Sequence, residues 1–215
     1  MSSIAVIDYG MGNLRSVAKA LERVASGAVQ VLVTQRAEDI LAADRVVFPG
    51  QGAIKSCIDE LERLALVDVV KTAAANKPFL GLCLGPQALM DFSEENGGTH
   101  GLGIVSGCVK GFSAFLRNNT QRDRIKVPHM GWNQVHQTYN HPLWRGISQD
   151  SRFYFVHSYY LEPATNDITA GVSCYALEFA SAIFQDNIFA VQFHPEKSAQ
   201  AGLQLLANFV CWRPS

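Results

Sequence analysis

The first half of this 215-residue chain alternates short apolar segments with longer stretches of helical periodicity. Apolar runs without polar alternation, separated by helices, are typical of a parallel sheet that is buried on both faces. Right-handed crossovers then place helices on both sides of the sheet. The expected strands are 4–7, 29–33, 45–48 and 79–82, and the expected helices are 14–25, 54–75 and 87–92.

The second half changes to strands joined by turns, with Asp186 and Asn187 as a plausible hairpin turn. The polar loops at 118–124 and 165–167 do not resemble linkers. We therefore expect one α/β domain over residues 1–215, with a mixed, largely parallel sheet flanked by helices. The expected strands here are 132–138, 152–161, 171–176, 182–185 and 188–193, followed by a helix at 199–211.

Charge and cysteine usage exclude several classes of function. The chain has 18 Lys and Arg residues and 19 Asp and Glu residues. This balance lacks the excess of positive charge that is typical of proteins that bind nucleic acid or an anionic membrane. No apolar stretch is long enough to span a membrane, and the N-terminus lacks a signal-peptide pattern. Five cysteines without a C-x-x-C pair argue against disulfides or a cysteine-rich zinc site. We expect a cytoplasmic chain without a metal or cofactor.

The segment 81–85 has the form G-x-C-x-G between an apolar strand and a helix, the context of a nucleophile elbow. Gly81 and Gly85 allow a sharp turn around Cys83, and the following helix presents its amides and positive dipole end to the sulfur. Both effects favour the thiolate, and the amide of Leu84 is placed to stabilise an oxyanion. Pro86 suits a first helical turn. Tight packing around a buried cysteine is the alternative interpretation.

A histidine and a carboxylate follow the last apolar strand. In an extended chain, positions two apart point the same way, so His194 and Glu196 can meet on one face while Pro195 stiffens the link. A carboxylate beside an imidazole fixes its tautomer and stabilises the imidazolium, as a cysteine nucleophile requires of its base. A surface histidine is the alternative.

The segment 49–52, Pro-Gly-Gln-Gly, follows another strand at the sheet edge where open α/β proteins place their sites. Such a backbone can aim an amide at a reacting carbonyl. Taken alone, the segment is better interpreted as an ordinary turn.

Segments 78–87 and 194–196 together resemble the triad-type, class I glutamine amidotransferase family. Within that family, further segments resemble the branch that forms the glutaminase subunit of imidazole glycerol phosphate synthase. The likeness covers both ends and the middle of the chain, and the matches occur in the right order. The segments of the second set are 8–14, 128–133, 154–160 and 192–198.

The resemblance implies a class I glutamine amidotransferase fold and a Cys-His-Glu triad. Cys83 would attack the side-chain amide carbon of L-glutamine, His194 would transfer the proton, and Glu196 would hold the imidazole. The main-chain amides of Gln51 and Leu84 would form the oxyanion hole. Family members bind the glutamine α-amino and carboxylate groups at the positions of Gly52, Gln87, Glu95, Ser158 and Tyr159. Glu95 suits the ammonium, although its sequence context also fits a solvated loop.

The resemblance also implies a partner, because free ammonia would protonate and diffuse away in water. In the family, a (β/α)₈ cyclase subunit uses the ammonia to make imidazole glycerol phosphate and an aminoimidazole carboxamide ribotide. Asn13, Arg15, Trp132 and Lys197 match positions expected at that interface, and Trp and Arg are frequent interface anchors. Each of them could also be an ordinary core or surface residue.

Two residues depart from the family pattern. Gln51 stands where valine is usual; since the oxyanion needs a main-chain amide, the change need not abolish the chemistry, but it leaves the details of activation open. Pro86 replaces a more common methionine. Three alternatives remain: a glutaminase that feeds another aminating synthase, such as one in surface-sugar modification; a non-catalytic scaffold subunit; and an unrelated cysteine hydrolase.

Overall fold

A computed structural model describes residues 2–27, 29–117 and 125–214. The expected polar loop at 118–124 lies outside these ranges. The strands of the described chain are β1 (Ser2–Ile7), β2 (Val29–Thr34), β3 (Arg45–Phe48), β4 (Phe79–Leu82), β5 (Phe92–Ser93), β6 (Thr99–His100), β7 (Gly107–Gly111), β8 (His129–Gln134), β9 (His136–Gln137), β10 (Arg152–His157), β11 (Tyr159–Pro163), β12 (Thr169–Tyr175), β13 (Leu177–Gln185) and β14 (Ile188–Val191).

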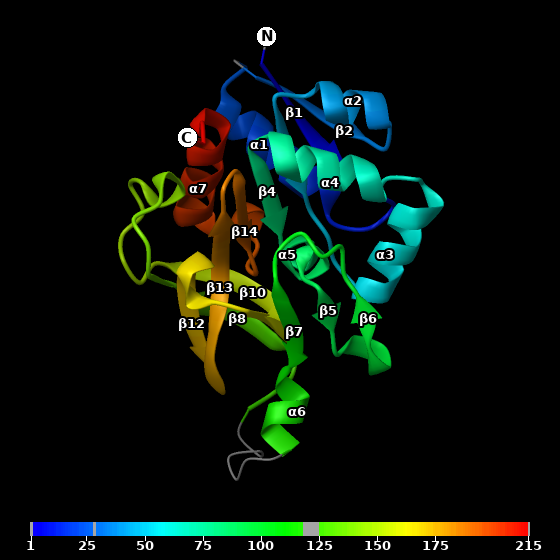
Figure 1. Cartoon of the computed structure of the whole chain (residues 1–215). Coiled ribbons are helices and arrows are strands. Elements are labelled where there is room, and N and C mark those ends of the chain that lie inside the picture. Colours follow the sequence, from blue (N-terminus) through cyan, green and yellow to red (C-terminus); the bar gives the residue numbers. More distant parts are fainter. Residues whose placement is uncertain (1, 28, 118–124, 215) are drawn as a thin grey trace.

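The main sheet runs β2-β1-β3-β4-β14-β13-β11-β7-β5-β6, and β12 joins it beside β13 (Figure 1). Strands β2, β1, β3, β4 and β14 form a continuous parallel block. From β13 onward most pairings are antiparallel. Strands β8 and β10 pair with each other as a separate antiparallel ribbon. The prediction of a mixed sheet is confirmed.

Helices cover both faces of the parallel block, as the apolar strands require. They are α1 (Leu14–Ala25), α2 (Ala37–Ala42), α3 (Ile54–Arg63), α4 (Val67–Asn76), α5 (Leu84–Leu89), α6 (Phe112–Arg117) and α7 (Ala199–Cys211), with 3₁₀ turns η1 (Glu95–Gly97), η3 (Pro142–Trp144), η4 (Asn166–Ile168) and η5 (Pro195–Lys197). None of these helices has the length and apolar character needed to cross a bilayer.

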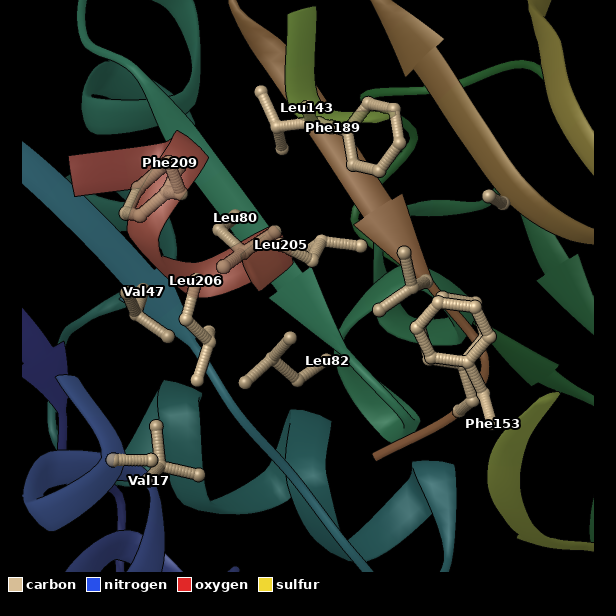
Figure 2. Close-up of a cluster of buried hydrophobic side chains, with 14 of the residues drawn as sticks. Val17, Val47, Leu80, Leu82, Leu143, Phe153, Phe189, Leu205, Leu206 and Phe209 are labelled. Atoms are coloured by element: carbon tan, nitrogen blue, oxygen red, sulfur yellow. The ribbon is translucent and has the colours of Figure 1, made fainter. Parts of the chain in front are cut away.

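Two apolar cores lie on opposite sides of the parallel strands. On one side, Leu80 and Leu82 of β4 pack with Val17 of α1 and with Leu205 and Phe209 of α7 (Figure 2). The second core is formed with α2, α3, α4 and α5, and includes buried residues at 40, 54, 61, 70 and 88. Alternate residues of each buried strand therefore belong to different cores.

Several predicted boundaries are wrong in the first half of the chain. The single helix expected at 54–75 is two helices, because the chain turns between α3 and α4 at Ala65, which has φ 54°. The helix expected at 87–92 begins earlier, at Leu84, directly after the elbow. The strands at 4–7, 45–48 and 79–82 and the first helix are confirmed.

In the second half, the strand expected at 152–161 is two strands in two different sheets. Strand β10 belongs to the ribbon, and β11 pairs with β7 and β13 in the main sheet. The segment 132–138 likewise divides into β8 and β9. The hairpin at Asp186 and Asn187 and the final helix are confirmed.

Candidate active site

Three neighbouring parallel strands bring the candidate catalytic segments together. Strands β3, β4 and β14 are adjacent in the sheet and end at the same edge. The segment 49–52 follows β3, Cys83 follows β4, and His194 lies three residues beyond β14. Sheet topology therefore explains how groups far apart in sequence meet at one site.

Cys83 occupies a strained elbow between β4 and α5. Its φ of 56° is unusual for a residue with a side chain, and its amide donates to the carbonyl of Val191 at 2.8 Å. A Cβ on Gly81 would lie 2.9 Å from Cβ of Ala190, and one on Gly85 would lie 2.3 Å from the Phe48 carbonyl oxygen. Both glycines are therefore needed for the close packing that holds the cysteine.

His194 and Glu196 form a buried pair. Nδ1 of His194 lies 2.9 Å from Oε1 of Glu196, and the two side chains are 6% and 1% exposed. The sequence suggested an extended chain here, and that prediction is wrong. The 3₁₀ turn η5 follows His194 and brings the carboxylate of Glu196 back to the imidazole ring. Ser198 holds this turn, since its hydroxyl donates to the His194 carbonyl at 2.6 Å.

The electrostatics of His194 favour a charged imidazole. Burial alone would lower its pKa, but hydrogen bonding and charge interactions with Cys83 and Glu196 outweigh burial and raise the pKa of His194 to about 10. The ring nitrogen Nε2 is buried and makes no hydrogen bond of regular geometry within the described residues. It therefore remains available to exchange a proton.

The two expected oxyanion donors lie beside the cysteine. The amide of Leu84 donates to the carbonyl of Gly50, but at 3.5 Å this hydrogen bond is long and weak. The hydroxyl of Tyr9 donates to the carbonyl of Pro49 at 2.8 Å and anchors the start of the loop. Gln51 and Leu84 both line the cavity at this edge.

That cavity has a volume of about 330 Å³, and both Cys83 and His194 open into it. Its walls include all five residues expected to bind glutamine. Lys197, expected at the partner interface, is also part of the wall, whereas Glu196 stands behind His194. The lining residues are Gln51, Gly52, Cys83, Leu84, Gln87, Glu95, Pro128, Val156, His157, Ser158, Tyr159, His194 and Lys197.

A buried amide missed by the sequence prediction supports the floor of the cavity. Gln87 donates to the Tyr159 carbonyl at 3.2 Å and to Oε1 of Gln192 at 3.0 Å. Gln192 in turn donates to the carbonyl of Cys83 at 3.1 Å. The missed signal is the register of β14 and β4, which pairs Val191 with Leu82 and so places the next residues side by side.

Glu95 is half-buried in η1 rather than in a solvated loop. Its Oε2 accepts a hydrogen bond from the amide of Ile54 at 2.7 Å. This contact joins η1 to the first turn of α3 and fixes the carboxylate at the cavity wall.

The expected partner residues fall into two groups. Nζ of Lys197 lies 6.0 Å from the ring centroid of Tyr154, whose ring contacts Trp132 edge-on at 6.2 Å. Trp132 is 46% exposed. Asn13 and Arg15 lie at the start of α1, a helix that contacts η5.

The chain belongs to the class-I glutamine amidotransferase family, whose model matches residues 5–212. The family match therefore agrees with the geometry of the site, because the elbow at Cys83 and the buried pair of His194 and Glu196 also suggest an enzyme of this class. It is 60% identical over 214 residues to the imidazole glycerol phosphate synthase subunit HisH of Nitrosospira multiformis, with 100% of both chains covered. The corresponding subunit of Nitrosococcus oceani is 59% identical, with 99% of this chain and 98% of the relative covered.

Solved structures show the same fold at much lower identity. One described as a glutamine amidotransferase superposes with a TM-score of 0.70 and 14% identity, covering 96% of each chain. Within residues 2–27, 29–117 and 125–214, no group of three or more His, Cys, Asp or Glu side chains gathers as a metal site would.

Proposed function

We propose that this chain is the glutaminase subunit of an imidazole glycerol phosphate synthase, with Cys83, His194 and Glu196 as its catalytic triad. The supporting observation is the convergence of the thiol, the imidazole and the oxyanion loop on one cavity at the ends of three adjacent strands. The relatives that match over the full chain carry the name of that subunit.

The proposed reaction uses this arrangement in two steps. Cys83 first gives its thiol proton to His194, and the resulting thiolate attacks the side-chain amide carbon of glutamine; the imidazolium then passes its proton to the departing ammonia. Water, deprotonated by the same imidazole, then cleaves the thioester to glutamate and restores the thiol. Glu196 holds the imidazole, and the amides of Gln51 and Leu84 stabilise the oxyanion, each worth about 3 kcal/mol.

Substrate binding follows from the cavity walls. The carboxylate of Glu95 binds the α-ammonium of glutamine, while the main chain at Ser158 and Tyr159 binds the α-carboxylate together with Gly52. Gln87 supports this main chain from below. The zwitterion thus meets polar partners of both kinds.

The proposed partner is a (β/α)₈ cyclase subunit that seats over the cavity mouth and receives the ammonia. Asn13, Arg15, Trp132 and Lys197 form the contact in this proposal, and residues 1–215 act as one domain. The five cysteines are free thiols, which fits a reducing compartment, and we place the complex in the cytoplasm.

The test is synthesis by the complex with glutamine or with an ammonium salt as nitrogen source. Cys83→Ala should abolish glutamine-dependent synthesis and leave ammonia-dependent synthesis intact. A diazo-ketone analogue of glutamine should modify the wild-type chain once, at Cys83, and a chain that resists modification would be the scaffold alternative. Failure to complement a histidine auxotroph would favour a different aminating synthase.

A further inference from the structure

A buried chain of hydrogen bonds runs beside the cavity through two histidines that the proposed chemistry does not use, and one of them, His157, is part of the cavity wall. His129 begins β8 and His157 ends β10, and the antiparallel register places them opposite each other. Nδ1 of His129 lies 2.8 Å from Nε2 of His157, and Nδ1 of His157 lies 2.7 Å from the carbonyl oxygen of Tyr159. Both histidines are buried.

The direction of this chain follows from hydrogen-bond chemistry. A carbonyl only accepts, so Nδ1 of His157 carries a hydrogen, and its Nε2, in the neutral ring, accepts from Nδ1 of His129. Nε2 of His129 is then an acceptor, and the side-chain amide of Asn133 donates to it at 3.3 Å. Every hydrogen bond from Asn133 to Tyr159 is satisfied when both rings are neutral.

The surroundings of the two rings favour that state and hold them in place. Burial lowers the pKa of His129 to about 4 and the pKa of His157 to about 3, so both are neutral at pH 7. The ring of His129 stacks on Tyr175 at 4.0 Å and on Phe155 at 4.8 Å between centroids. Rotation of this ring would require both aromatic neighbours to move.

The chain ends where glutamine is proposed to bind. The Tyr159 carbonyl accepts from His157 and from Gln87, and Ser158 and Tyr159 form part of the cavity wall. We propose that His129 and His157 are positioning residues that hold the main chain at 158–159 in its glutamine-binding conformation. This inference rests on the proposed function, because it assigns a role to that main chain.

Strand β8, which begins with His129, also carries Trp132, a residue proposed to contact the cyclase. Along β8, His129 points inward while Met130 and Trp132 are 61% and 46% exposed. A partner that contacts these two side chains would also contact strand β8, which contains His129. The test is therefore made in the complex with the cyclase.

Two variants of His129 separate positioning from simple packing. His129→Asn keeps an amide donor where Nδ1 faces His157, whereas His129→Leu has no donor. We expect His129→Leu to raise the KM for glutamine at least tenfold with an unchanged ammonia-dependent rate. His129→Asn should stay within threefold of wild type. His136→Leu, at an exposed histidine of β9, is the control and should leave the KM unchanged.

An unchanged KM in His129→Leu, equal losses in both variants, or loss of ammonia-dependent synthesis as well would overturn the proposal. A wild-type complex that makes no product from glutamine would count against the proposed function instead. A separate measurement, ¹⁵N NMR of the wild-type protein at pH 7, gives the tautomer and the charge of the two imidazoles. Nδ1–H tautomers of His129 and His157 are expected, and a charged ring or an Nε2–H tautomer in either would refute the pair.

Discussion

The side-chain amide of Gln192 donates a hydrogen bond to the main-chain oxygen of Cys83, with a nitrogen–oxygen distance of 3.1 Å. The same side chain accepts from Gln87 at 3.0 Å and is fully buried. The strained elbow is thus held by the side chain that directly follows the neighbouring strand β14, as well as by its own glycines. This explains how a cysteine with a positive φ is kept in one orientation.

Replacing that amide should loosen the elbow. Gln192→Met conserves length but removes the donor to the Cys83 carbonyl and the acceptor of one of the two Gln87 hydrogen bonds, at a cost of about 1–3 kcal/mol each in the free energy of unfolding. We expect a fall of at least tenfold in kcat/KM for glutamine. Urea unfolding and glutamate release measure the two effects. Gln200→Met, at an exposed position of α7, should change the free energy of unfolding by less than about 0.5 kcal/mol.

Removing the charge of Glu95 should weaken glutamine binding. Glu95→Gln retains an oxygen for the amide of Ile54 but loses the carboxylate proposed to bind the α-ammonium of glutamine. A hydrogen bond to a charged group is worth about 1.5–3 kcal/mol, so the KM should rise roughly tenfold to a hundredfold. Glu94→Gln is the matched control, since Glu94 is exposed and lies outside the cavity lining. Equal effects of the two variants would contradict the assignment of Glu95.

Truncation of Trp132 should reduce affinity for the cyclase. Interface hot spots cost about 2 kcal/mol or more on truncation, so Trp132→Ala should raise the Kd at least thirtyfold, measured by calorimetry. Its unfolding temperature should stay close to that of wild type, because the side chain is half-exposed. Tyr139→Ala removes an aromatic side chain of similar exposure, 51%, from outside the proposed interface. A comparable loss of affinity in Tyr139→Ala would argue against the proposed surface.

The interactions of His194 with Cys83 and Glu196 should make stability depend on alkaline pH. The folded chain holds the His194 proton up to about pH 10, whereas an ordinary histidine releases it near 6.5. The contribution of His194 is therefore full below pH 6.5 and is lost as the pH rises through 10. Urea unfolding between these values should show a declining free energy in wild type and a flatter profile in His194→Gln. A matching slope in the two proteins would rule out this linkage.

Local patterns predicted the part of the site that depends on neighbours in sequence. The elbow at Cys83 follows from an apolar strand, two glycines and a helix, and the contact of His194 with Glu196 follows from their spacing. The geometry of the contact between His194 and Glu196 was not predicted, because Pro195 begins a 3₁₀ turn instead of continuing the strand.

Features that depend on tertiary contacts were missed. The break between α3 and α4 is hidden because Leu64 and Leu66 continue the apolar helical pattern across the turn. The segment 152–161 reads as one strand, yet it leaves one sheet and enters another at Ser158. The role of Gln192 is set by pairing with a strand more than a hundred residues earlier.

The ribbon of β8 and β10 has a consequence for how such enzymes can be re-engineered. Trp132 and Tyr154 belong to this ribbon, but the carbonyl of Tyr154 accepts from the amide of His194 at 2.9 Å, and the amide of Tyr154 donates to the hydroxyl of Ser198 at 2.9 Å. The outer face of the ribbon is therefore tied through its backbone to the turn that carries the imidazole. A redesign aimed at another ammonia acceptor should exchange exposed side chains of the ribbon and keep its backbone.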